Sequence, residues 1–259
     1  IMTTIILASN NKDKVKEVKE ILKGYNVISL KDAGIDLDVE ENGTTFEENA
    51  LIKAKAVMEV TGQLTLADDS GLEIDALNGE PGIYSSRYLG EDTSYVKKNS
   101  VILERLKDVP EEKRSARFVC AVAAAFPDGQ TKVIRGTMEG IIGYEIKGEN
   151  GFGYDPIFYV DEYHCSTAEL TEEQKNEISH RGKALRSMKK LFQFFLRGTD
   201  CMYVKPAFPC HTINLCNGVI LFQYGDHFFQ CIRHGLNFKI TGNRTTDFLW
   251  INDRCVFLN

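Results

Sequence analysis

The sequence Leu64-Thr65-Leu66-Ala67-Asp68-Asp69-Ser70-Gly71 is the most informative stretch of the chain. Its first four residues are typical of a buried strand, and two aspartates follow directly. Adjacent carboxylates repel each other unless a cation or hydrogen-bond donors lie between them. Mg²⁺ prefers oxygen ligands and needs only one or two carboxylates besides a phosphate. The motif therefore predicts a strand that ends at a magnesium site, with an Asx-turn as the alternative.

The N-terminal segment predicts a second strand that leads through a polar turn into a helix. Residues 4–8 form a short β-rich run, and residues 14–22 carry apolar side chains at helical spacing. A helix N-terminus offers free N–H groups and a positive dipole end, which can bind an anion. The alternative is a polar turn with an N-cap, and the turn lacks the glycines of a P-loop. The candidate anion-binding residues here are Ser9, Asn10, Asn11 and Lys14.

Further strands and helices alternate along residues 45–192. A capping-box pattern at Thr45-Phe46-Glu47-Glu48 opens a helix that Gly62 closes. We also expect helices over 94–106 and 182–192, a hairpin of strands 116–126 and 132–137, and a strand over 157–160. This order predicts an α/β fold in which helices flank a mixed central sheet.

Three other segments carry side chains that could take part in chemistry. Glu40-Glu41 is an acidic pair on a predicted loop, which by itself indicates a solvated face. Residues 151–156 combine glycines, which let a ligand approach the backbone, with aromatic rings that can stack on a base. Residues 179–182 place His180 and Arg181 before a helix, where they could hold a phosphate or a purine edge. The alternatives are a glycine-rich turn and an ordinary helix cap.

Together these segments resemble the motifs of the inosine triphosphate pyrophosphatase family. Six segments match in family order and spacing: residues 8–17, 45–54, 67–72, 79–88, 151–158 and 179–185. The resemblance covers essentially all of residues 2–192. Ser9 stands where the family often has Thr, and the hydroxyl that can bind phosphate is kept.

The resemblance implies a fold, a reaction and a set of site residues. The fold would have two lobes with the active-site cleft between them. The reaction would be the Mg²⁺-dependent hydrolysis of ITP, dITP and XTP to the monophosphate and pyrophosphate, which cleanses the nucleotide pool. Asp69 would be the general base, and the metal ligands would be Glu40, Asp68 and Asp69. The substrate would be bound by Ser9, Asn10, Asn11, Lys14, Lys53, Ser70, Phe152, Gly153, Tyr154, Asp155, Lys175, His180 and Arg181.

Two alternatives remain for the function. One is a related pyrophosphatase that acts on modified pyrimidine triphosphates, and the other is a nucleotide-binding regulator that has lost catalysis. The acidic residues Glu40, Asp68 and Asp69 are all present, which disfavours the inactive regulator.

The composition limits the partners. The 259 residues carry a net charge of −6, which argues against a broad basic face for nucleic acid. No apolar run approaches the roughly 18 residues that a membrane span needs, and residues 1–7 lack the features of a secretory signal. We expect a cytoplasmic enzyme, and the family resemblance implies a homodimer.

The last part of the chain differs in composition from the rest. Residues 193–259 contain no Glu, the only Trp, and five of the seven cysteines, none in a CxxC pair. The cysteine spacing argues against a zinc site, and a disulfide scaffold conflicts with a cytosolic enzyme. We therefore expect a pyrophosphatase domain over 1–192 and an unassigned tail over 193–259. A translated non-coding stretch is the favoured interpretation of the tail, ahead of an appended β-rich domain or an interaction segment.

Overall fold

The computed structural model describes residues 2–197 and, beyond them, only segments 211–216, 219–224, 227–232, 238–241, 247–251 and 254–258. The chain divides into two compact units, residues 1–189 and residues 190–259. Each unit is described by itself.

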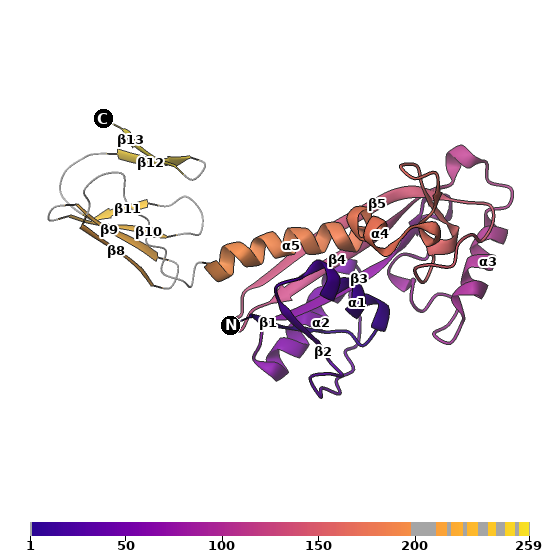
Figure 1. Cartoon of the computed structure of the whole chain (residues 1–259), viewed down its shortest axis with the longest axis horizontal. Helices are drawn as coiled ribbons and strands as arrows, with labels where there is room; N and C mark the ends of the chain where they lie inside the picture. Colours follow the sequence, from indigo (N-terminus) through magenta and orange to yellow (C-terminus); the bar gives the residue numbers. More distant parts are fainter. Residues whose placement is uncertain are drawn as a thin grey trace. The chain divides into compact units, whose positions relative to one another are not determined.

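A mixed seven-stranded sheet forms the centre of the first unit, as expected (Figure 1). The strand order is β2-β1-β3-β4-β5-β6-β7, with β1 parallel to β2 and β3 and the other neighbours antiparallel. β2 and β7 have no counterpart in the sequence prediction. The bounds are β1 Thr4–Leu7, β2 Asn26–Ser29, β3 Thr65–Ile74, β4 Ser115–Ala125, β5 Thr131–Ile142, β6 Phe158–Val160 and β7 Cys165–Ser166.

The strand that carries the aspartate pair is longer than predicted. β3 does not end at Asp68-Asp69 but continues through them to Ile74, because β4 pairs with it along its full length. On its other edge the parallel partner β1 pairs only with Thr65 and Leu66. The aspartates therefore lie within a strand, directly after the point where one of its two neighbours ends.

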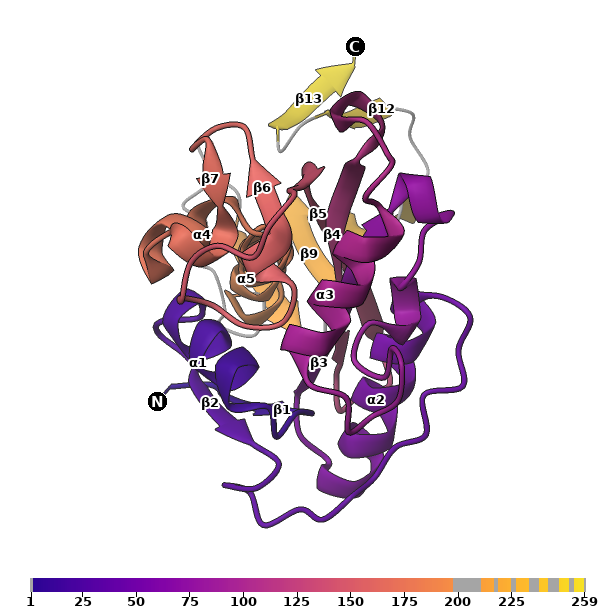
Figure 2. The same cartoon turned by 90° about the vertical axis from the view of Figure 1, so that its right-hand side faces the viewer.

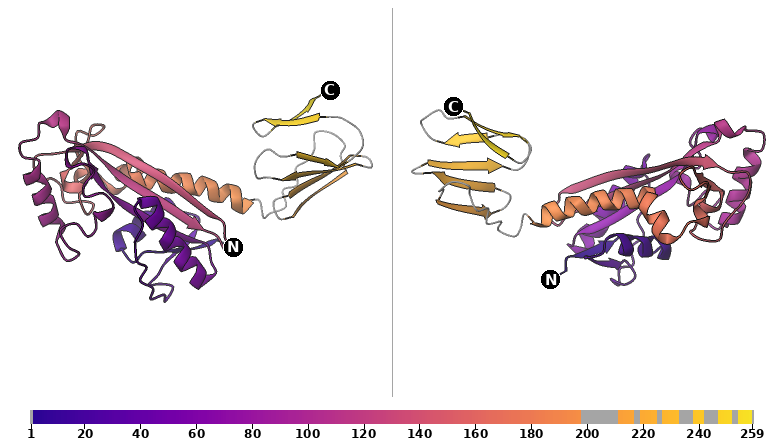
Figure 3. Two further views of the ribbon diagram at one scale, coloured as in Figure 1. Left: turned by 180° about the vertical axis from the view of Figure 1, so that it is seen from behind. Right: turned by 45° about the horizontal axis from the view of Figure 1, so that its top comes forward.

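Helices cover both faces of this sheet. α2 packs on one face of β3 and β4, and α5 lies along the other face (Figures 1 and 3). Gly136 of β5 permits the close approach of α5, since an added Cβ would lie 2.3 Å from the carbonyl oxygen of His180. The helices are α1 Lys12–Ile21, α2 Phe46–Thr61, α3 Tyr95–Arg105, α4 Glu172–Ile178 and α5 His180–Arg197, with 3-10 turns η1 Asp75–Leu77, η2 Gly82–Tyr84, η3 Glu111–Lys113, η4 Asp155–Ile157 and η5 Thr167–Glu169.

The ends of α2 follow the sequence signals closely. The Thr45 side chain accepts a hydrogen bond from the Glu48 N–H, and Gly62 ends α2 in the left-handed conformation. The Glu48 carboxylate reaches back to the N–H of Thr44 at 2.7 Å. The sequence prediction missed α4, and it ended α5 at residue 192, five residues before the observed end.

Two hydrophobic clusters lie at different positions along β3. Ala67 belongs to a cluster that includes Phe46, Ala50, Ala54 and Val57 of α2. Leu72 and Ile74 belong to another, which includes Ile102 of α3, Phe158 of β6 and Leu170. Figure 2 shows α3 and β6 together in one part of the first unit. Asp68, Asp69 and Ser70 therefore lie on β3 between the residues of the two clusters.

Beyond the end of α5, the described segments of the second unit are β-strands. Strands β8 His211–Cys216, β9 Val219–Tyr224, β10 His227–Ile232 and β11 Phe238–Thr241 form an antiparallel sheet in the order β11-β10-β9-β8. Strands β12 Asp247–Ile251 and β13 Arg254–Leu258 form an antiparallel pair. In the part of the chain that the structure describes, no helix is long and apolar enough to cross a membrane.

Candidate active site

The two adjacent aspartates of β3 point to opposite faces of the sheet. Successive side chains alternate along a strand, and each aspartate meets a different helix. Asp68 contacts Arg181 of α5, and Asp69 contacts Asn49 of α2. This geometry separates the two carboxylates without a cation between them. The sequence prediction placed Asp68 and Asp69 together at a strand end, whereas they lie within the strand and alternate between its faces.

Asp68 is held by two cations on the α5 face. Its Oδ2 lies 3.0 Å from Lys14 Nζ and 3.1 Å from Arg181 Nη2. Arg181 Nη2 also donates to Ser70 Oγ at 2.9 Å. Burial by itself would raise the pKa of Asp68, but the charges of Lys14, Arg181 and Lys53 hold that pKa well below its usual range. Asp68 is therefore an ionised, buried carboxylate.

A chain of alternating charges continues from Asp68 across the same face. Glu17 of α1 accepts from Arg181 and lies 3.3 Å from Lys175 Nζ. Lys175 Nζ lies 2.6 Å from Asp155 Oδ2. Burial opposes ionisation of Glu17, but Arg181 and Lys175 outweigh it and lower the pKa of Glu17. These ion pairs connect residues that were predicted to bind the phosphates or the base, and they come from α1, β3, α4, α5 and η4.

Asp69 has a different environment on the α2 face. Its Oδ2 accepts from Asn49 Nδ2 at 3.1 Å, and its Oδ1 accepts from the Ser70 N–H at 3.0 Å. Burial raises the pKa of Asp69, the nearby charge of Lys53 opposes the rise, and the charge of Glu41 adds to it. A raised pKa brings a carboxylate closer to neutral pH, where it can accept a proton from water.

Lys53 occupies the strand edge that β1 leaves open. The carbonyl oxygen of Leu66 still accepts from the N–H of Ala8, directly after β1, and the next carbonyl on that edge, Asp68 O, accepts from Lys53 Nζ at 2.8 Å. Lys53 Nζ also lies 2.8 Å from Glu41 Oε1. Burial would lower the pKa of Lys53, but Asp69, Asp68 and Glu41 raise it, so the ammonium stays charged.

The predicted phosphate-binding turn is organised by its own side chains. Ser9 Oγ accepts from the Asn11 N–H at 3.2 Å, and Asn11 Oδ1 caps α1 by accepting from the N–H groups of Asp13 and Lys14. Asn10 Oδ1 accepts from the Lys31 N–H at 3.0 Å. The turn therefore directs Lys14 toward Asp68 and ties Asn10 to the segment after β2.

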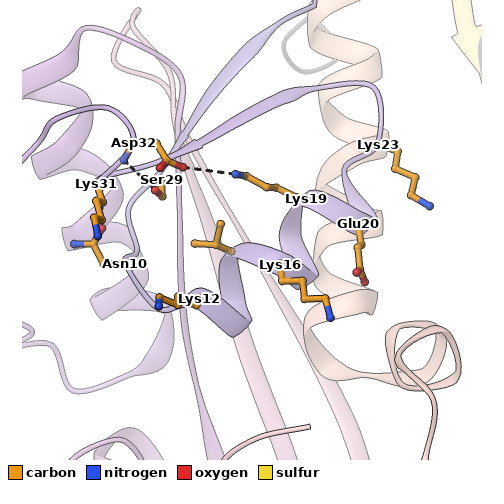
Figure 4. Close-up of a pocket in the computed structure, with 10 residues that line it drawn as sticks. Asn10, Lys12, Lys16, Lys19, Glu20, Lys23, Ser29, Lys31 and Asp32 are labelled. Carbon is orange, nitrogen blue, oxygen red and sulfur yellow. Dashed lines mark hydrogen bonds and ion pairs between the residues drawn. The ribbon is translucent and has the colours of Figure 1, made fainter. Parts of the chain in front are cut away.

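Asn10 also lines a basic groove between α1 and the residues at the end of β2, with a volume of about 630 Å³ (Figure 4). Most of its charged side chains are lysines, and Lys19 pairs with Asp32 at 3.6 Å. Of the predicted site residues only Asn10 belongs to it. The other lining residues are Lys12, Val15, Lys16, Lys19, Glu20, Lys23, Ser29, Lys31 and Asp32.

The predicted base-binding loop folds around the Asp155 carboxylate. Asp155 Oδ2 accepts from the Phe152 N–H at 2.8 Å, and Asp155 Oδ1 accepts from Thr167 Oγ1 at 2.9 Å. The Phe152 ring lies 4.6 Å from Lys175 Nζ and 5.7 Å from the Arg181 guanidinium carbon. Phe152 therefore lies against Lys175, which joins Glu17 to Asp155, and near Arg181, which joins Glu17 to Asp68.

Tyr154 of this loop and His180 of α5 are both buried. The Tyr154 hydroxyl donates to Ser85 O at 2.7 Å, which makes this side chain a support for the loop. The His180 ring stacks on Phe118 at 4.9 Å, and its buried Nδ1 has no partner among the described residues. Burial, reinforced by the charges of Arg181 and Lys175, keeps the pKa of His180 well below its usual value. His180 is therefore neutral near pH 7.

The predicted metal set is only partly brought together. Glu40 is exposed and makes no hydrogen bond or ion pair with the described site residues, whereas its neighbour Glu41 contacts Lys53. Within residues 2–197 and the described strands, no three His, Cys, Asp or Glu side chains form a metal-holding group. Asp69 lies beside Glu41 on the α2 face, whereas Asp68 Oδ1 is buried without a partner on the other side of the sheet. The Asp69 and Glu41 carboxylates fit Mg²⁺, which needs one or two carboxylates when a substrate phosphate completes its shell.

The sequence prediction omitted three residues that the structure places in the site. Glu41 belongs to an acidic pair whose members sequence alone did not separate. Asn49 precedes Lys53 by four residues, so both lie on one face of α2, and this spacing could have revealed it. Glu17 stands three residues after Lys14 on α1 and was assigned no role.

Comparisons with known proteins show which family the chain belongs to. Residues 5–191 match the model of the Ham1 family. A dITP/XTP pyrophosphatase of Desulforamulus reducens is 53% identical over 184 residues, which cover 70% of this chain and 92% of the relative. The dITP/XTP pyrophosphatase of Bacillus subtilis is 48% identical over 195 residues, which cover 74% and 98%.

The fold matches a solved structure as well. The Staphylococcus aureus Ham1 protein has a TM-score of 0.67 and 46% identity, and the match covers 76% of this chain and all of that protein. The family match extends over most of the chain and includes every residue of the candidate site. The chain therefore belongs to the Ham1 family.

Proposed function

We propose that the chain hydrolyses dITP, ITP and XTP to the nucleoside monophosphate and pyrophosphate. The relatives named dITP/XTP pyrophosphatase support this substrate class. The observation that carries the proposal is the position of Asp69, a buried carboxylate with a raised pKa beside the ammonium of Lys53. Hydrolysis of a phosphoric anhydride needs a proton acceptor for water next to positive charge for the phosphates, and these two residues supply both.

Asp69 takes the proton of the attacking water in this proposal. Lys53 and Lys14, with the turn of Ser9, Asn10 and Asn11, neutralise and orient the triphosphate. Lys53 is fixed by Asp68 O and Glu41, so its ammonium is already oriented before substrate binds. The Asp68 charge does the same for Lys14 and Arg181.

Mg²⁺ would be held by Asp69 and Glu41 on the α2 face, and Asp68, which points to the other face of the sheet, stays a prediction as a ligand. When bound, the ion supplies charge neutralisation at the phosphates and lowers the pKa of a bound water. Glu40 stays a prediction as a ligand, and Glu41 is favoured because its carboxylate already faces Lys53 and raises the pKa of Asp69.

The base would lie against Phe152, enclosed by residues 153–155, Lys175, His180 and Arg181. The unpartnered Nδ1 of neutral His180 supports selection among purines. As a donor, this nitrogen pairs with the 6-carbonyl of hypoxanthine or xanthine and is left unpaired by the 6-amino group of adenine. An unpaired buried group disfavours the wrong substrate strongly.

The experiment is a product assay on the full chain. Pyrophosphate and orthophosphate release are measured with dITP, XTP, dATP, dGTP and a modified pyrimidine triphosphate, each with Mg²⁺ or a chelator. Pyrophosphate from dITP and XTP in the presence of Mg²⁺ supports the proposal. Preferred turnover of the pyrimidine substrate supports the related pyrophosphatase, and binding without any turnover supports the inactive regulator.

The assembly and location follow from the same resemblance. We propose that the chain forms a homodimer whose interface lies in the first unit. We also propose that it acts on the nucleotide pool in the cytoplasm. Light scattering of the chain at micromolar concentration should give twice the monomer mass, and a clean monomer would contradict the dimer.

A further inference from the structure

Helix α3 carries two buried polar side chains that the proposed reaction does not use. Lys98 and Asn99 are 1% and 2% exposed. Lys98 Nζ donates to Ser86 O at 2.6 Å, and Asn99 Nδ2 donates to Gly153 O at 3.1 Å. Neighbouring positions of one helix therefore anchor two separate loops, and the second of these is the proposed base-binding loop.

Within the described part of the chain, only the nitrogen of the Asn99 side-chain amide makes a hydrogen bond. Its Oδ1 is buried and has no partner among the described residues. Turning the amide over would set that oxygen against the Gly153 carbonyl oxygen, so the observed orientation is fixed. A buried acceptor without a donor is unfavourable, and an apolar side chain of similar size avoids it. An amide at this position is explained by the hydrogen bond that its nitrogen donates to Gly153.

That hydrogen bond lies at the centre of the loop. Gly153 adopts a φ of +71°, a left-handed conformation that favours glycine and turns its carbonyl toward α3. The preceding residue, Phe152, is held from the other side by the bond from its N–H to Asp155. Two hydrogen bonds therefore set the direction of the Phe152 ring. One joins the Phe152 N–H to Asp155 within the loop, and the other joins Asn99 of α3 to the Gly153 carbonyl oxygen.

We propose that Asn99 is a positioning residue that holds residues 151–155 in the conformation that receives the purine base. This rests on the proposed function, because only there is the loop assigned to the base. Asn99 touches no reacting atom, so it acts through the Phe152 ring. Its loss weakens binding of the nucleoside part of a ligand and leaves binding of the phosphate part unchanged.

The test compares Asn99→Leu with the parent chain and with Ser100→Ala. Ser100 is exposed on the same helix, and its hydroxyl bonds only within α3, to Val96 O. The probes are dIMP, which carries the base, and tripolyphosphate, which carries none, each assayed as an inhibitor of dITP hydrolysis with Mg²⁺. For Asn99→Leu we expect dIMP to bind about fivefold more weakly, the factor of one hydrogen bond, with tripolyphosphate unchanged. Ser100→Ala should match the parent in both.

Hydrogen exchange and thermal unfolding separate positioning from a structural role. We expect faster amide exchange in residues 151–155 of Asn99→Leu at a melting temperature equal to that of the parent. Unchanged dIMP binding, or equal weakening of both probes with a lower melting temperature, would overturn the proposal. Asn99→Ala removes the same N–H and replaces Asn99→Leu if that variant does not fold. If neither folds, Asn99 supports the fold and the proposal is wrong.

The proposed function and this inference fail in distinguishable ways. A parent chain that does not hydrolyse dITP contradicts the proposed function. Exchange of residues 151–155 then still decides whether Asn99 holds the loop, since that measurement needs no substrate.

Discussion

Two regions on opposite faces of β3 use neighbouring residues of one motif in contrasting ways. On the α5 face Asp68 is held by Lys14 and Arg181, and its pKa is lowered. On the α2 face Asp69 has an amide partner, Asn49, and its pKa is raised. Strand alternation gives one carboxylate a permanent charge that organises cations, and the other a proton affinity suited to a base. The comparison shows that two adjacent acids in a sequence need not form one site.

The largest expected effect is the loss of turnover when Asp69 is replaced. Asp69→Asn keeps the shape of the side chain but accepts no proton, so we expect kcat for dITP to fall by about 10²- to 10⁴-fold. The fall in kcat is measured as the rate of pyrophosphate release from dITP. Binding of dITP should survive, and turnover within threefold of the parent would remove Asp69 from the role of base.

The next effect is on stability and concerns Asp68. Asp68→Asn leaves the buried Arg181 and the nearby Lys14 without this counter-charge, which should cost about 3 kcal/mol of unfolding free energy. For a domain of this size the melting temperature falls by roughly 6–12 °C.

The same variant has a defined pH dependence. The pKa of Asp68 is lower in the folded chain than in the unfolded chain, so its ionised form stabilises the fold above about pH 4. That contribution is lost as the pH falls through the lowered pKa. The gap between the melting temperatures of parent and Asp68→Asn should therefore narrow below pH 4. A gap that stays constant from pH 7 to pH 3 would contradict the account of the α5 face.

Replacing Phe152 tests whether the substrate base binds next to the cations of the α5 face. Phe152→Ala removes the stacking ring, and we expect KM for dITP to rise about tenfold with a smaller change in kcat. Phe152→Tyr keeps the ring and serves as the control. Equal KM values for parent and Phe152→Ala would show that the base lies elsewhere.

The smallest expected effect on dITP hydrolysis is that of removing the residues after Arg197, which belong to the second unit. None of the site residues of either face lies beyond Arg181, and α5 extends to Arg197. A chain ending after Arg197 should therefore keep the kcat and KM of the full chain for dITP. Lower turnover or a melting temperature lower by several degrees would show that residues 198–259 support the first unit.

Much of the fold could be predicted from the sequence, because local signals decided it. Thr45 and Gly62 bracket α2, and the apolar run of β4 with its turn gave the central hairpin. β2 and α4 were missed because each is short, with four and seven residues. The end of β3 was wrong because its length depends on pairing with β4, which lies about 50 residues later in the chain.

The sequence indicated candidate residues for the site but not their arrangement. The residue patterns pointed to Lys14 and the aspartates, and the family resemblance added Lys53 and supplied the roles. The choice of Glu41 over Glu40 depends on how a loop approaches Lys53, which no periodicity encodes. The contact between Asn99 and Gly153 joins residues 54 positions apart in the chain, so only the folded structure shows it.

The pH dependence of dITP hydrolysis tests the central claim, that Asp69 is the base and Asp68 is not. A base must be ionised, so kcat/KM falls as the pH drops through the pKa of Asp69, which burial raises and a bound Mg²⁺ would lower. We expect this acid limb in the parent and in Asp68→Asn, and we expect it to be absent from the residual activity of Asp69→Asn. An unchanged acid limb in Asp69→Asn, or its loss in Asp68→Asn, would contradict the account.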